Sequence, residues 1–380
     1  MSNVKNLILL SYLILQYFLF QMGWRKAPEV QRLYDASLTG LAFLFGWRRK
    51  VRFVGAEDFP QKGPAIIASN HIEIDDPFVT GNAVFVLSGR NIRPRVMMRD
   101  DFFVGMPRWL KKIVDPDEVA QLIGAILITR QGADEAQLLP FVDVLRNGEV
   151  FLIYPGRSRS RSGMFIDYRD WIRSPGATSQ FVAGGQEGRA KPAIPTIPVT
   201  RTRNPVTRRS ALVFGKPLYL APGADRAEQR VFDLQLVVAM SDLIEINVPH
   251  VVSAILYLHC LHGGADTMPF SALRDAVGSV FADIRRPPDA GCRNYPVRYT
   301  DPAALNGLDR EINRTLKFLS GNRALARRGS VIRLNPSVIL SVPQSFSRYR
   351  SQNPVKYLVN QILHLPDVVS SIERAAERLR

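Results

Sequence analysis

The chain has 380 residues, of which 46% are hydrophobic and 22% charged. This composition excludes a disordered chain, because disorder requires low hydrophobicity together with high charge. The fifty lysines and arginines outnumber the thirty-four acidic residues and give a formal net charge of +16, which favours anionic partners such as nucleic acid, an anionic membrane face or phosphorylated substrates. The only cysteines, Cys260 and Cys292, exclude a disulfide framework and a cysteine-rich zinc site.

The first fifty residues contain two apolar stretches. Residues 6–24 carry no charge, and a helix of that length spans roughly 28 Å, close to the ~30 Å hydrocarbon core of a bilayer. Residues 38–47 are too short to span, and a basic cluster follows them at 48–52. A signal peptide is disfavoured because bulky residues stand where a cleavage site needs small ones. We therefore expect membrane-associated helices over residues 1–50, on the cytoplasmic face of a bacterial inner membrane; the alternative is a buried hairpin of a soluble protein.

Beyond residue 50, short apolar runs alternate with helical stretches, which is typical of an α/β fold. Buried strands are expected at 64–68, 124–129, 150–154, 194–200 and 211–214. Helices are expected at 76–88, 134–147, 226–244, 249–261, 270–284, 303–319 and 354–379, and a Gly- and Ser-rich loop at 171–192. The expected domains are an N-terminal part (1–50), an α/β domain (51–222) and a mostly helical C-terminal domain (223–380).

The first candidate for chemistry is His71 with Asp76, in the segment Asn-His-Ile-Glu-Ile-Asp-Asp-Pro at 70–77. A turn between strand and helix can bring the carboxylate onto the imidazole. This contact fixes the tautomer and leaves the other nitrogen as a general base, a contribution of about 10²–10⁴-fold. The spacing alone is a weak signal, because Asp76 could equally be a plain N-cap of the following helix.

Two later segments place arginine after a buried strand. Arg130 follows the strand at 124–129, and Arg157, Arg159 and Arg161 alternate with serines after the strand at 150–154. Guanidinium groups beside hydroxyls suit a phosphate monoester. One alternative is a solvated Arg-Ser tract that binds nucleic acid. Another is a nucleophile elbow, which requires a glycine where Ser160 stands.

Taken in chain order, these segments resemble the four blocks of the glycerol-3-phosphate and lysophosphatidate acyltransferase superfamily. Asn70–Pro77 matches its His-x4-Asp block, Gly124–Arg130 its second block, and Phe151–Gly163 its third, usually Phe-Pro-Glu-Gly-Thr-Arg-Ser. Ile194–Val199 and the later Phe214–Pro217 resemble the fourth block and the strand after it. The order agrees over about residues 52–220. The chain departs from the family in the third block, where Gly-Arg replaces Glu-Gly, a change that bears on the identity of the acceptor.

The resemblance implies an acyltransferase-type mixed sheet flanked by helices, and an enzyme without a metal or other cofactor. In it His71, oriented by Asp76, takes the proton of an acceptor hydroxyl, which then attacks an acyl thioester of CoA or acyl carrier protein. The residues implied to bind the acceptor's phosphate are Arg130, Arg157, Arg159, Ser160 and Arg161. The expected partners are the thioester donor, a phosphorylated glycerol acceptor, membrane lipids and acyl carrier protein. No nucleic-acid partner is expected.

Residues 356–365 resemble a Tyr-x-x-Asn-x-Ile-x-His motif found near the end of many glycerol-3-phosphate acyltransferases. The motif favours glycerol 3-phosphate as the acceptor and lysophosphatidate as the product. Two alternatives stay open: a lysophosphatidate acyltransferase, and a serine-type lipid hydrolase with Ser158 or another serine as its nucleophile and His71 as its base. Four histidines outside the first block are expected to be structural: His250, His259, His262 and His364.

Overall fold

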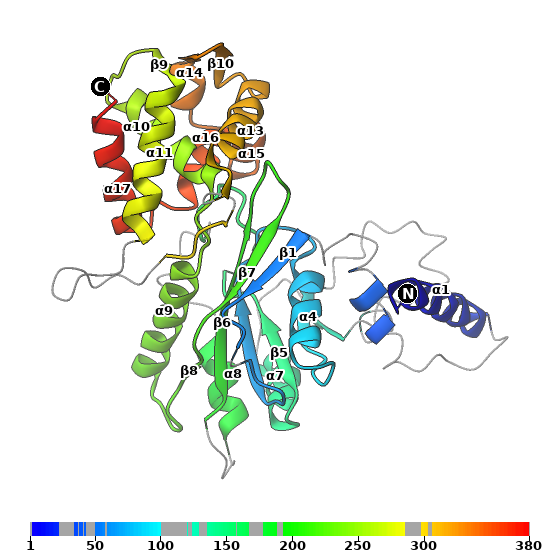
Figure 1. Ribbon diagram of the computed structural model, residues 1–380. Helices are drawn as coiled ribbons and strands as arrows, with labels where there is room; N and C mark the ends of the chain where they lie inside the picture. Colours follow the sequence, from blue (N-terminus) through cyan, green and yellow to red (C-terminus); the bar gives the residue numbers. More distant parts are fainter. Residues whose placement is uncertain are drawn as a thin grey trace.

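The computed structural model describes residues 2–22, 34–36, 38–40, 42, 50–57, 59–99, 120, 124–128, 135–156, 158–166, 178–187, 193–285, 298–302 and 306–379. Its centre is an eight-stranded mixed sheet with strand order β1-β7-β6-β2-β5-β3-β4, in which β8 pairs with β6 (Figure 1). The strands are β1 (Val51–Val54), β2 (Ala65–Ser69), β3 (Arg95–Arg99), β4 (Ala125–Ile128), β5 (Val150–Ile153), β6 (Pro195–Arg203), β7 (Ser210–Phe214) and β8 (Leu218–Tyr219).

Strand β2 lies at the middle of the sheet and is parallel to both of its neighbours, β5 and β6. All five of its residues are buried, as expected for a parallel strand that is covered on both faces. Because parallel strands place their carboxyl ends at the same edge, the segments that follow β2 and β5 meet beside the end of β6. The predicted strands that became β2, β4, β5, β6 and β7 are confirmed, whereas β1 and β3 were not predicted.

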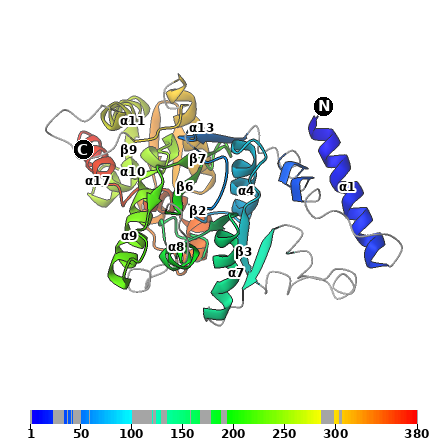
Figure 2. The same ribbon diagram turned by 90° about the horizontal axis from the view of Figure 1, so that it is seen from below.

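Among the described residues, four helices cover the two faces of the sheet: α4 (Asp76–Leu87), α7 (Glu135–Arg146), α8 (Thr178–Gln186) and α9 (Arg226–Asp242). Alternate residues of a strand point to opposite faces. Ile67 of β2 accordingly packs in a core with Val84 of α4, while Ile66 packs in a second core with Phe141 of α7 and Phe181 of α8. The helix α9 joins this second core and therefore packs on the sheet. Figure 2 shows α4 on the side of the sheet opposite α8 and α9.

The segment predicted to be a loop at 171–192 contains the helix α8, so this expectation was wrong for residues 178–186. The helix forms because Phe181 and Val182 are buried and because Asp233 of α9 accepts hydrogen bonds from the amide and hydroxyl of Ser179 in its first turn. These tertiary contacts outweigh the weak helix propensity of its serine and glycine residues.

The C-terminal unit, α10 to α17, has a core of its own that runs from Ile244 to Ala375. It consists of helices around a three-stranded antiparallel sheet of order β10-β11-β9. Its elements are α10 (Val248–Leu261), β9 (Thr267–Pro269), α11 (Phe270–Arg285), α13 (Leu308–Gly321), β10 (Leu325–Arg328), β11 (Val331–Leu334), α14 (Pro336–Ile339), η2 (Phe346–Arg348), α15 (Tyr349–Gln352), α16 (Pro354–Asn360) and α17 (Pro366–Glu377).

The single helix predicted at 354–379 is divided into α16 and α17. The break lies just before Pro366, which has no amide hydrogen to continue a helix and disfavours helical backbone at the residue before it.

The apolar N-terminal stretch forms helix α1 (Ser2–Gln21). Within the described part of the chain no helix is long and apolar enough to cross a membrane, so the expectation of N-terminal membrane helices is not supported. The second stretch, 38–47, is described only at 38–40 and 42 and otherwise lies outside the described residues.

Candidate active site

The carboxyl edge of the central sheet brings three segments together. His71 stands two residues after β2, the segment 154–166 follows β5, and Arg201 lies near the end of β6. The amide of Ser160 donates a hydrogen bond to the carbonyl oxygen of His71 at 2.8 Å. The arginine-bearing loop, residues 156–166, and the histidine loop, residues 70–75, are therefore joined directly.

Asp76 is fully buried and accepts hydrogen bonds from both loop and strand. Its Oδ2 accepts from Nδ1 of His71 at 2.8 Å and from the amides of Ile72 at 2.6 Å and Glu73 at 2.8 Å. Its Oδ1 accepts from the guanidinium of Arg201 at 2.6 Å. The structure thus brings the side chains of His71 and Asp76 together, and their catalytic role stays a prediction.

Asp76 is not the N-cap of the helix that it begins. The N-cap residue of α4 is Asp75, and Pro77 occupies the first turn. The carboxylate of Asp76 instead turns back toward the residues that precede the helix. The plain N-cap that was considered as an alternative role for Asp76 is therefore wrong.

The environment of Asp76 keeps its carboxyl group ionised. Burial opposes ionisation, but the hydrogen bond from His71 and the positive charge of Arg201 outweigh it, so that the pKa of Asp76 is lowered from its usual value. An ionised carboxylate only accepts hydrogen bonds, so Nδ1 of His71 carries the hydrogen in this contact. The Nε2 atom of the neutral imidazole is then the one able to accept a proton.

Arg201 was not predicted from the sequence. Its side chain is 4% exposed and donates to Asp75 at 2.7 Å as well as to Asp76. Its main chain is also fixed, because its amide donates to Oδ1 of Asn70 at 2.7 Å and its carbonyl accepts from Nδ2 of the same residue at 3.0 Å. Burial lowers the pKa of an arginine, yet the two carboxylates raise that of Arg201. The sequence signal that could have indicated Arg201 was the presence of an arginine within the strand segment that forms β6.

Tyr154, at the end of β5, packs its ring on the imidazole of His71. The ring centroids are 4.6 Å apart and the planes are inclined by 31°. Burial, followed by the negative charge of Asp76, raises the pKa of Tyr154 well above its usual value, so its phenol is neutral. The ring contact and the bond to Asp76 together fix the orientation of His71.

The five residues predicted to bind phosphate have different positions. Arg159 is partly buried and makes no hydrogen bond or ion pair with another described residue, while Arg161 is exposed. Ser160 is buried, and its hydroxyl donates to the carbonyl of Met164, which stabilises the turn of the loop. Arg130 and Arg157 lie outside the described residues. The strand before Arg130, β4, ends at the same edge of the sheet as β5.

A cavity of about 830 Å³ lies at the opposite, amino edge of the sheet. Its lining includes Gly63 before β2, Gly124 before β4 and Gly148 before β5, but not His71. Despite its size, this cavity is not the candidate active site, because the His71–Asp76 pair and the arginine-bearing loop lie at the carboxyl edge of the sheet. No group of three or more His, Cys, Asp and Glu residues that could hold a metal occurs in the described ranges.

Comparison with known proteins shows what this segment is similar to. The family model described as Acyltransferase matches residues 50–201, a range that contains His71, Asp76, Arg159 and Arg201. Among solved structures, the chain matches the 1-acyl-sn-glycerophosphate (LPA) acyltransferase PlsC from Thermotoga maritima with 14% sequence identity and a TM-score of 0.37, over 63% of this chain and 96% of that one. No curated protein matches the chain. The family match thus covers the segment that holds the histidine loop, the arginine-bearing loop and most of β6.

Proposed function

We propose that this protein transfers a fatty acyl group from an acyl thioester to a hydroxyl of glycerol 3-phosphate and so produces lysophosphatidate. The observation that carries the proposal is the hydrogen bond between His71 and the buried, ionised Asp76, within an acyltransferase domain whose arginine-bearing loop is bonded to the same histidine. The thioester is one of CoA or of acyl carrier protein.

In the proposed reaction, Nε2 of His71 takes the proton of the acceptor hydroxyl while the hydroxyl oxygen attacks the thioester carbonyl. The carbon–sulfur bond then breaks, and the thiolate leaves and recovers the proton from the imidazolium. Asp76 holds the imidazole in the required tautomer and stabilises the positive charge that develops on it. No covalent enzyme intermediate is needed, since the oxygen attacks the thioester directly.

The acceptor's phosphate fits the arginine-bearing loop. Arg159 directly precedes Ser160, whose amide bonds to His71. Its guanidinium makes no hydrogen bond or ion pair with a described residue that a ligand would have to break. A phosphate held there would fix which hydroxyl faces the imidazole. The preference for glycerol 3-phosphate is supported by the resemblance of residues 356–365 to the motif of those enzymes.

Two other candidate activities would give different products. A lysophosphatidate acyltransferase would use the same dyad with a lipid acceptor. A serine-type lipid hydrolase would need a reactive serine beside His71. Ser158 is exposed, and no hydrogen bond to His71 is found for it among the described residues, so the hydrolase is not favoured.

The proposal is tested with purified protein in detergent and one acyl thioester, offered with glycerol 3-phosphate, with lysophosphatidate or with neither. Mass spectrometry should detect lysophosphatidate from the first mixture. Phosphatidate from the second mixture alone would assign the lipid acceptor instead. Labelling of a serine by a fluorophosphonate probe, with free fatty acid as the product, would support the hydrolase.

We also propose that the protein works at the cytoplasmic face of a membrane, where its acyl donor and lipid product partition. Membrane flotation of the full chain tests this, because a protein that stays with the unbound fraction at low salt would contradict it.

A further inference from the structure

The motif-bearing helix α16 of the C-terminal unit contacts the arginine-bearing loop. Nδ2 of Asn360 donates a hydrogen bond to the carbonyl oxygen of Ser162 at 2.9 Å, and both residues are buried. The two residues are 198 positions apart in the chain. Because a buried carbonyl without a partner is costly, this bond holds the loop against α16.

The next residue of the loop, Gly163, allows a close approach of the two backbones. Its φ is +90°, and a Cβ atom placed there would lie 2.0 Å from the carbonyl oxygen of Tyr357. Four residues after Asn360, the ring centroid of His364 lies 5.8 Å from the ring centroid of Phe165. The tyrosine, asparagine and histidine of the motif thus contact three positions of one loop.

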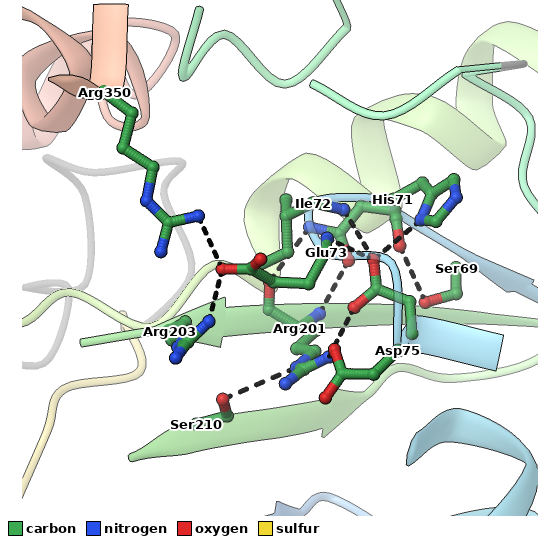
Figure 3. Close-up of polar contacts among 11 residues, drawn as sticks. Ser69, His71, Ile72, Glu73, Asp75, Arg201, Arg203, Ser210 and Arg350 are labelled. Carbon is green, nitrogen blue, oxygen red and sulfur yellow. Dashed lines mark hydrogen bonds and ion pairs between the residues drawn. The ribbon is translucent and has the colours of Figure 1, made fainter. Parts of the chain in front are cut away.

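The histidine loop is also held by the C-terminal unit. Oε1 of Glu73, two residues after His71, accepts from the guanidinium of Arg350 on α15 at 2.8 Å and from that of Arg203 on β6 at 2.6 Å. Figure 3 shows Arg350 reaching Glu73 from the C-terminal unit, on the side away from the imidazole. The amide of Glu73 bonds to Asp76, so this contact supports the segment that carries the catalytic pair.

We propose that the C-terminal unit is a specificity element of the acceptor site, with Asn360 as a positioning residue. Through Ser162 it sets the place of the loop and hence of the Arg159 guanidinium relative to His71, without touching the substrate itself. The inference rests on the proposed acyl transfer, and it assigns to the Tyr-x-x-Asn-x-Ile-x-His segment the task of presenting the phosphate-binding loop. The ion pair of Arg350 with Glu73 has the smaller role, since both side chains are partly exposed.

The test is the variant Asn360→Leu, which keeps the branched shape and the number of heavy atoms of the side chain and removes the donor. We expect the KM for glycerol 3-phosphate to rise about tenfold, the size of effect expected for the loss of one buried hydrogen bond, with the KM for the thioester unchanged. Hydrogen exchange of the amides in 158–166 should become faster in the same variant. The control Asn313→Leu changes an asparagine whose bonds stay within the C-terminal unit and should alter none of these quantities.

An unchanged acceptor KM in folded Asn360→Leu protein would overturn the inference, and so would an equal rise in both KM values. Should this variant fail to fold, Asn360→Ser is judged by the same criteria, because its shorter side chain cannot reach the carbonyl. The exchange measurement needs no substrate. Faster exchange in a chain that transfers no acyl group would therefore contradict the proposed function alone, while unchanged exchange would contradict the contact.

Discussion

Two histidines of this protein show how the partner of an imidazole decides its use. His71, at the carboxyl edge of the sheet, is partly exposed and bonds to an ionised aspartate. His250, in the core of the C-terminal unit, is fully buried and bonds to the neutral side chain of Gln361 at 2.9 Å. Burial lowers the pKa of His250 to about 4. The first arrangement can accept and return a proton, whereas the second holds a neutral ring that contributes packing.

Among the residues that contact or surround His71, the largest effect is expected from Asp76→Asn. An amide at this position no longer fixes the imidazole tautomer and leaves Arg201 with less negative charge nearby, so kcat should fall by about 10³-fold or more. The control is Asp75→Asn, which removes the other carboxylate that contacts Arg201 but does not touch the imidazole. Steady-state kinetics should show a far smaller loss for the control. Comparable losses in both variants would mean that Asp76 acts only through Arg201.

The next effect is expected from Arg201→Met. Loss of the guanidinium removes a positive charge that lowers the pKa of Asp76, so that pKa should rise, and the acid limb of the kcat/KM profile should move to higher pH. We expect about a 10²-fold loss of kcat/KM together with reduced stability, since two carboxylates lose their partner. Arg201→Lys should recover part of the activity, and the exposed control Arg209→Ala should lose none. An acid limb that does not move would contradict the role given to Arg201.

The pH dependence of stability should differ between the two regions. The pKa of His250 is about 4 in the folded chain, below its usual 6.5, so its contribution is present above pH 6.5 and is lost as the pH falls toward 4, by about 3 kcal/mol in all. Asp233 under the sheet acts in the opposite sense, because burial raises its pKa to about 6, and its contribution is lost as the pH rises through 6.

Chemical denaturation between pH 4 and 7 checks this contrast. The variant His250→Gln should lose stability less steeply on acidification than the parent chain, and Asp233→Asn should lose it more steeply. Parallel curves for all three proteins would contradict the assigned environments.

The smallest effect is expected from Arg159→Ala. If the guanidinium holds the acceptor's phosphate, its removal should raise the KM for glycerol 3-phosphate about tenfold and leave the KM for the thioester unchanged. Arg161→Ala, on the exposed side of the same loop, is the matched comparison and should have the weaker effect. Equal rises in the two KM values for Arg159→Ala would assign this residue another task.

The pairing of His71 with Asp76 could be predicted because it is local: a buried strand, a short turn and a proline in the first helical turn place the two side chains together. The contact of Arg201 with Asp76 could not be predicted, because the two residues are 125 positions apart in the chain. Only the order of the strands in the sheet brings them together. The hydrogen bond between Asn360 and Ser162 could not be predicted for the same reason. The helix α8 was missed because its core contacts, rather than its own composition, make it helical.

The central claim is that the imidazole of His71 activates an acceptor hydroxyl, and the most direct measurement compares the parent chain with His71→Ala. Both proteins, purified, receive an acyl thioester and glycerol 3-phosphate, and the release of thiol and the acylated product are followed together. We expect equal amounts of thiol and lysophosphatidate from the parent chain, and a rate at least about 10²–10³-fold lower from the variant, roughly 3–4 kcal/mol of barrier. The exposed His262→Ala control should match the parent. A folded His71→Ala protein that transfers the acyl group at a near-parental rate would contradict the account.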